Sequence, residues 1–149
     1  MADWLFIPPS TPEHWVAYYQ LRFEVLRQPW GQLKGSELAD DDATSLHGMI
    51  ADNKGEALAV GRIHMTADDQ AQVRFMAVKT SMHGLGLGKR LLHYLEHRAK
   101  KEHPALVQIL LHAREHAVPF YEKQGYQVID KSYVLFDSIQ HYLMVKSLI

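Results

Sequence analysis

Hydrophobic and polar positions change their spacing several times along the chain, and each change predicts a new element. The apolar stretch Trp4–Ile7 is followed by two prolines, which predicts a short strand that stops there. Apolar side chains then recur at helical spacing up to about Arg27, behind Ser10 or Thr11 as an N-terminal cap. The first part of the chain is therefore expected to form a strand, a long helix and then a loop or short helix.

The spacing of apolar positions changes to about two residues from residue 45 onwards. This alternation predicts three strands in a meander, namely Leu46 to Ala51, Ala57 to Met65 and Gln72 to Val78. A glycine-rich turn follows. Leucines at helical spacing then predict an amphipathic helix from about Gly86 to Lys101.

The last third of the chain returns to strands. Leu106–Leu111 is an uninterrupted apolar run, which is typical of a buried central strand. A short helix from Arg114 to Gln124 and a hairpin of Val128–Phe136 with His141–Leu148 complete the pattern. This order predicts an α/β fold, in which helices flank a mixed, mostly antiparallel sheet of about seven strands.

Length and composition favour a single folded domain over residues 1–149, since 47% of the residues are hydrophobic and 22% are charged. The 16 Lys and Arg against 17 Asp and Glu give no basic field for nucleic acid, so small-molecule partners are favoured. The sequence contains 0 cysteines, which excludes disulfides, zinc thiolates and a cysteine nucleophile.

The start of the chain has no basic residues, and its apolar stretch is too short for a signal peptide or a membrane span. No later segment is long and apolar enough either. We therefore expect a cytoplasmic protein with no membrane partner and no nucleic-acid partner, while a homodimer stays open.

The segment from Met76 to Arg90 reads as a strand, a tight glycine turn and the start of a helix. Glycines let the backbone approach a ligand closely. Unpaired N–H groups and the positive end of the helix dipole, with Lys89 and Arg90 nearby, suit a pyrophosphate. On this loop alone, a glycine-rich turn without a ligand remains the alternative.

Two other phosphate-binding loops do not match this segment. A dinucleotide fingerprint that begins at Gly84 needs glycine at the position of Lys89. A Walker A loop needs glycine at the position of His83 and Ser or Thr at the position of Arg90. These two common phosphate-binding folds are therefore excluded.

Two blocks of the sequence resemble the GCN5-related N-acetyltransferase (GNAT) family. The run from His83 to Gly88 matches the family pattern Q/R-x-x-G-x-G/A except at its first position, where His83 replaces Arg or Gln. The run from Ala113 to Tyr126 looks like the family's later helix, with the pattern A-x-x-F-Y-x-K-x-G-Y/F. Both blocks occur in the family's order.

The resemblance implies an acyltransferase that moves an acetyl group from acetyl-CoA, its co-substrate, to an amine of a small molecule or peptide by direct attack, with no metal. It implies that the strand before the loop offers main-chain groups, that the loop holds the pyrophosphate, and that the later helix covers the thiol end. The implied cofactor-binding residues are Met76, Ala77, Val78, His83, Gly84, Leu85, Gly86, Leu87, Gly88, Lys89, Arg114, Ala117 and Phe120.

Tyr121 stands where the family usually has the acid that protonates the leaving thiolate, so the resemblance implies that it is catalytic. Core packing is the alternative role, because Tyr121 shares helical spacing with other apolar residues. The general base stays open among His64, His112, His141 and Glu24. We expect the acceptor pocket from the first helix, the loop Trp30–Asp42 and the last hairpin.

Other functions compete with the enzyme. The same fold could be a non-catalytic acyl-CoA-binding sensor or docking module. The strings His93–His97 and His112–His116 both read H-x-x-E-H, which raises a metallohydrolase. We expect the first string to face solvent and the second to straddle a strand end and a helix start, so neither predicts a metal site. The acidic run Asp40–Asp42 is interpreted as a solvated turn.

Overall fold

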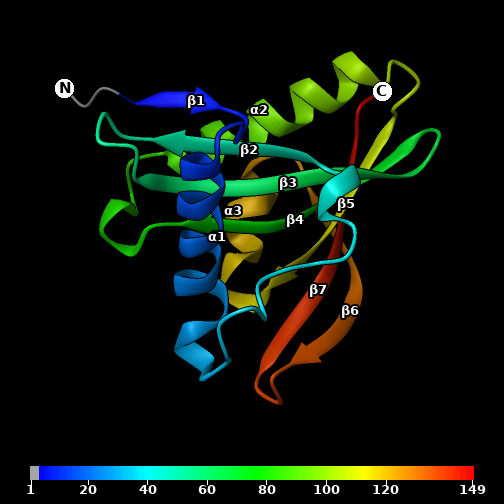
Figure 1. Ribbon diagram of the computed structural model, residues 1–149. Helices are drawn as coiled ribbons and strands as arrows, with labels where there is room; N and C mark the ends of the chain where they lie inside the picture. The colour runs from blue at the N-terminus through cyan, green and yellow to red at the C-terminus, as the bar shows by residue number, and fades with distance from the viewer. Residues whose placement is uncertain (1–3) are drawn as a thin grey trace.

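One sheet of seven strands organises the chain, in the order β1-β2-β3-β4-β5-β7-β6 (Figure 1). The computed structural model describes residues 4–149, so residues 1–3 of the predicted domain lie outside the described part. The strands are β1 (Leu5–Ile7), β2 (Leu46–Ala51), β3 (Ala57–Ala67), β4 (Gln70–Val78), β5 (Gln108–Arg114), β6 (Gln127–Leu135) and β7 (Ile139–Ser147). Only β4 and β5 pair in parallel, so the predicted mixed, mostly antiparallel sheet is confirmed.

Helices cover both faces of the sheet (Figure 1). Helix α1 (Pro12–Leu26) begins where Thr11 accepts a hydrogen bond from the backbone of His14, at 3.1 Å, which satisfies one of the free amides at its start. Its buried side chains pack on β3 and β4. Helix α2 (Leu87–Glu102) buries its leucine face on the opposite side of β2 and β3, together with the short helix α3 (Val118–Lys123).

Strands β4 and β5 diverge soon after they meet. Residues Gln70–Gln72 of β4 pair with Gln108–Leu110 of β5, and the pairing stops there. Strand β5 then continues along β7. The register of β4 against β3 also shifts next to Phe75, whose φ of 58° is rare for a bulky side chain. The second half of β4 therefore leaves an opening in the sheet beside β5.

The predicted bounds of the third quarter of the chain need correction. The strand predicted at Leu106–Leu111 is β5 and runs to Arg114, because every residue from Gln108 to Arg114 has a partner on β7. The helix predicted from Arg114 therefore starts later. A 3₁₀ turn at residues 115–117 precedes α3. A proline stands in the first turn of α3, where its missing N–H costs no helical hydrogen bond, so it favours a helix start at this point.

The interpretation of Asp40–Asp42 as a solvated turn is wrong for Asp42, which is buried, and incomplete for Asp41, whose partly exposed side chain is paired. Asp42 is buried and lies 2.9 Å from Arg22 of α1 and 2.7 Å from Arg62 of β3, while Asp41 lies 2.7 Å from Arg62. Both guanidinium groups are fully buried, and a buried charge needs a partner of opposite sign. The acidic run therefore holds α1 to the sheet.

The string His93–His97 also differs from its prediction in part. Both of its histidines are exposed, but Glu96 is buried and accepts hydrogen bonds from Tyr126 at 2.6 Å and Lys146 at 3.0 Å. Tyr126, just before β6, and Lys146 of β7 therefore hold Glu96 in place. The other string does straddle β5 and the following turn, as predicted. None of the helices in residues 4–149 is long and apolar enough to cross a bilayer.

Candidate functional site

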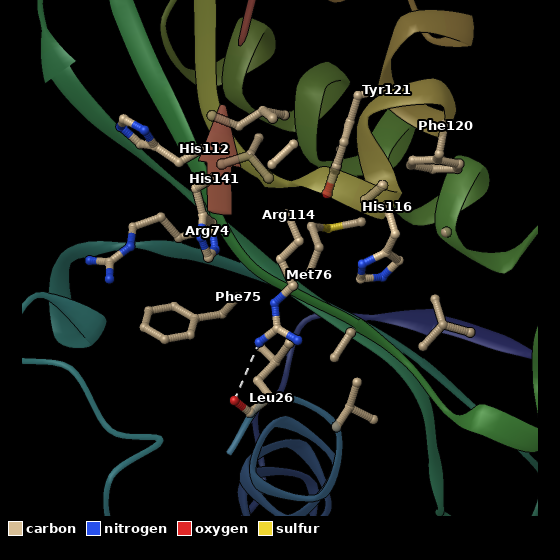
Figure 2. A pocket seen from close by; sticks show the side chains of 18 of the residues that line it. Leu26, Arg74, Phe75, Met76, His112, Arg114, His116, Phe120, Tyr121 and His141 are labelled. Carbon is tan, nitrogen blue, oxygen red and sulfur yellow. Dashed lines mark hydrogen bonds between the residues drawn. The ribbon is translucent and has the colours of Figure 1, made fainter. Parts of the chain in front are cut away.

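A pocket of about 940 Å³ lies where β4 and β5 diverge. The end of α1, the second half of β4, the glycine turn, the end of β5, α3 and the hairpin β6–β7 all contribute to its wall. Figure 2 shows Phe120 and His116 at one end of it, and His112, Arg74 and His141 at the other. A volume of this size suits a small organic ligand or cofactor.

The glycine turn forms one end of this pocket. Gly84 and Gly86 have φ values of 82° and 79°, which residues other than glycine rarely adopt. Helix α2 begins directly after them, at Leu87. The amides of the first helical turn have no acceptor within the helix. A Cβ on Gly88 would lie 3.4 Å from the ring of Phe120 and 3.5 Å from Val78. The turn is therefore a narrow cradle of free N–H groups, which fits a phosphate ligand.

The structure brings almost all of the predicted cofactor-binding residues into this one pocket. Those that line it are Met76, Ala77, Val78, His83, Gly84, Gly86, Leu87, Gly88, Lys89, Arg114, Ala117 and Phe120. Leu85 does not line it, and its residue is 54% exposed. The Nε2 atom of His83 lies 3.1 Å from the carbonyl oxygen of Val78, so this side chain turns toward β4. That these residues bind the cofactor stays a prediction.

Tyr121 reaches the middle of the pocket from α3, and its hydroxyl points into the cavity (Figure 2). The residue is only 9% exposed, and its ring packs edge-on against Phe120 and Tyr126. Burial raises the pKa of the Tyr121 phenol, and nearby Arg114 opposes this only in part. The phenol is therefore protonated at neutral pH and combines core packing with a free proton donor.

Arg114 crosses the pocket from the end of β5 to the end of α1. Its guanidinium carbon lies 4.3 Å from the centre of the Trp30 ring, and its Nη2 atom lies 3.4 Å from the carbonyl oxygen of Leu26 (Figure 2). Burial and the neighbouring Arg27 lower the pKa of Arg114. This side chain thus links the end of β5 to the end of α1 across the pocket.

Comparison with known families identifies the kind of protein that carries this pocket. Residues 34–148 match the model of the family described as acetyltransferase (GNAT) domain. The chain belongs to this GNAT family. The resemblance seen in the two sequence blocks is confirmed.

Solved structures agree with the fold. A Lactobacillus plantarum protein described as an N-acetyltransferase is 22% identical, with a TM-score of 0.84 over 99% of each chain. Escherichia coli ElaA is 20% identical, with a TM-score of 0.79 over 97% of this chain and 99% of its own. A GNAT acetyltransferase of Elizabethkingia anophelis with acetyl-CoA bound is 14% identical, with a TM-score of 0.76 over 98% and 99%. At these identities the likeness shows the fold alone.

Two of the four candidate bases of this GNAT chain line the pocket, namely His112 and His141. Burial lowers the pKa of each below the ordinary 6.5, and Arg74 adds to the effect on His112. Both imidazoles are therefore neutral at pH 7. His64 instead lies 3.8 Å from Asp41, outside the pocket wall, and Glu24 is exposed.

Three further pocket residues of this GNAT chain have no signal in the sequence. Arg27 comes from the end of α1, Arg74 from β4 and Tyr133 from β6. The ring of Tyr133 stacks on His141 at 4.4 Å and lies 5.3 Å from His112. Of the predicted acceptor segments, α1 and the hairpin line the pocket, whereas Trp30 reaches it only through Arg114.

Proposed function

We propose that this GNAT chain transfers an acetyl group from acetyl-CoA to an amine of a small molecule or peptide by direct attack. One observation carries the proposal, namely that the cradle of free amides at the start of α2 opens into the same cavity as the hydroxyl of Tyr121. A phosphate site and a proton donor in one cavity suit a co-substrate with both a phosphate end and a reactive end. The acetyl-CoA bound to the Elizabethkingia anophelis relative supports this choice.

The residues present fit acetyl-CoA, because the glycine turn leaves open space and free donors. A Cβ on Gly84 or Gly86 would meet no atom within 4 Å. The amides from Leu87 to Lys89 and the Lys89 side chain would hold the pyrophosphate. Acetyl-CoA, when bound, supplies the activated thioester. The exposed backbone of β4 from Met76 to Val78 would offer an N–H to polarise the carbonyl.

Proton movement in this proposal uses the other pocket side chains. The protonated phenol of Tyr121 donates a proton to the leaving sulfur. A neutral imidazole, at His112 or His141, accepts the proton that the amine loses. Apolar side chains of α3 cover the same space, which limits access of water.

The experiment that tests the proposal is a thiol-release assay with acetyl-CoA and a panel of amines, beside calorimetric titration with CoA. Binding of CoA with amine-dependent release of thiol is the expected result. Binding of CoA without release from any amine would instead support a sensor or docking module. Absence of CoA binding would contradict the proposal altogether.

A further inference from the structure

The pocket end that lies away from the glycine turn is rich in arginine and has no acidic side chain. Arg27 and Arg74 line it beside His112 and His141, and Arg114 lies between it and the other end. Within the described residues, none of the side chains that line the whole pocket is an aspartate or a glutamate. The chain as a whole carries a net charge of −1, so this concentration of positive charge is local. We call these three arginines the arginine cluster.

The arginine cluster has no carboxylate partner in residues 4–149. Arg27 donates only to the carbonyl oxygens of Ser36, at 3.1 Å, and Leu26, at 3.0 Å. Arg114 donates only to the carbonyl of Leu26. Arg74 has neither a hydrogen bond nor an ion pair there, and its guanidinium carbon lies 4.6 Å from the centre of the Phe75 ring.

The fold neutralises its two fully buried arginines with carboxylates, whereas the half-buried Arg27 and Arg114 and the exposed Arg74 of the pocket have none. Arg22 and Arg62 both bind Asp42 at 2.9 Å or less. Arg62 also binds Asp41. These two acidic side chains are therefore already paired. In residues 4–149, no N–H group of Arg27, Arg74 or Arg114 donates to a carboxylate.

Repulsion within the cluster shows that these charges act on one another. Burial lowers the pKa of Arg27, and Arg74 and Arg22 lower it further. Burial and then Arg27 lower the pKa of Arg114. Like charges held together in a partly desolvated cavity are unfavourable until an anion enters. A ligand with a negative group would relieve this repulsion.

We propose that the acceptor is an amine that also carries an anionic group, a carboxylate or a phosphate, which Arg27 and Arg74 bind at the arginine cluster. This inference rests on the proposed acetyl transfer. The glycine turn, whose amides would hold the cofactor's pyrophosphate, packs beside Phe120, which lies at the opposite end of the pocket. The anion of the acceptor therefore has its own binding groups.

The cluster also suits the chemistry of the amine. Positive charges nearby disfavour an ammonium ion, so they keep the bound amine in its neutral, nucleophilic form. The same charges repel simple cationic amines that carry no anion. The anionic group thus supplies binding, while the amine next to it stays reactive.

The test compares acceptors that differ only in the anion. Thiol release is measured with phenylalanine, phenylalaninamide and phenethylamine, and with O-phosphoethanolamine and ethanolamine. We expect kcat/KM for a carboxylate or phosphate acceptor to exceed that of its match without an anion by roughly tenfold or more, the effect of one charge-assisted hydrogen bond. Whichever anion gives the larger ratio identifies the group. Equal or higher values for the amines without an anion would overturn the inference and leave acetyl transfer intact.

Variants assign the effect to the cluster. Arg74→Gln and Arg27→Gln should each raise KM for the anionic acceptor roughly tenfold while KM for acetyl-CoA stays unchanged. Arg74→Glu should shift preference toward a diamine such as putrescine. Arg98→Gln is the matched control, since this arginine lies on α2 outside the pocket wall and pairs with Glu102. An unchanged acceptor preference in both Arg74 variants would contradict the proposal.

A binding measurement separates this inference from the proposed function. Protein saturated with CoA is titrated calorimetrically with N-acetylphenylalanine and with N-acetylphenethylamine. We expect the acid to bind at least roughly tenfold more tightly, and Arg74→Gln to abolish the difference. Tighter binding of the acid without any thiol release would support the anion site and count against acetyl transfer. Failure of both compounds to bind, or equal binding, would overturn the anion site.

Discussion

The hydroxyl of Tyr121 is a single group whose removal changes little else, because no side chain or backbone group in residues 4–149 hydrogen-bonds to it. Tyr121→Phe should lower turnover by about 10²–10⁴-fold, the usual contribution of a general acid. CoA affinity should change far less, since the ring and its packing against Phe120 stay. Thiol release and calorimetry with CoA measure the two quantities.

Tyr126→Phe is the control for this substitution. Tyr126 packs beside Tyr121 and donates a hydrogen bond to Glu96 at 2.6 Å, but it does not line the pocket. The variant loses this hydrogen bond, so we expect its free energy of unfolding to fall by about 1–3 kcal/mol while its turnover stays near normal. Wild-type turnover in Tyr121→Phe would show that Tyr121 only packs.

Asp42 joins two fully buried arginines, so its charge has a large effect on stability. Asp42→Asn leaves Arg22 and Arg62 without a full counter-charge and should cost about 3–5 kcal/mol of unfolding free energy. Urea unfolding at neutral pH measures the loss. Asp40→Asn removes the same charge from an exposed neighbour and should change stability by less than about 0.5 kcal/mol. Equal effects of the two variants would refute the pairing.

At the scale of an element, the turn between β4 and α2 is the proposed site of the cofactor's pyrophosphate. Gly86→Trp places a large side chain in the open space over the free amides, so CoA affinity should fall below detection in calorimetry. Gly55→Trp is the control, because Gly55 has a similar φ of 85° and open surroundings in the turn between β2 and β3, away from the pocket. Unchanged CoA affinity in Gly86→Trp would place the cofactor elsewhere.

Across the whole molecule, buried titratable groups set the response of stability to acid. Burial lowers the folded-state pKa of four histidines below the ordinary 6.5, namely His47, His64, His112 and His141. The unfolded chain therefore binds more protons than the folded chain as the pH drops below 6.5. Their contribution is present above pH 6.5 and is lost as the pH falls through the folded values.

A second loss of stability belongs to the acidic run. Its hydrogen bond with Arg62 lowers the pKa of Asp41 to about 2, and pairing with Arg22 and Arg62 lowers that of Asp42 against its burial. Both carboxylates stabilise the fold above their ordinary value of 3.8, and this effect disappears as the pH falls toward 2. Urea unfolding from pH 8 to pH 2 should show both declines in the free energy of unfolding. The stability of Asp42→Asn should stay below that of the wild type through the first decline and approach it only below about pH 3.8, where the wild-type carboxylate becomes protonated. Stability that rises on acidification from pH 7 would contradict this account.

The sequence by itself determined the elements and the family of this protein, because both depend on local patterns. The alternation in β4 and the leucine spacing in α2 repeat within a few residues, and the glycine turn carries its backbone requirement in its own residues. The family's two motifs are likewise contiguous runs. The sequence alone therefore singled out Tyr121 and a set of predicted cofactor residues, most of which line one pocket.

Only the tertiary structure decided which charges meet. Asp42 is a surface residue by its neighbours in sequence and a buried partner by its contacts with Arg22 and Arg62. The arginine cluster joins α1, β4 and β5, which lie far apart along the chain. Electrostatic energy depends on distance in space and on burial, and neither is written in the spacing of residues along the chain. The arginine cluster proposed to bind the acceptor, unlike the glycine turn, therefore became visible only in the folded molecule.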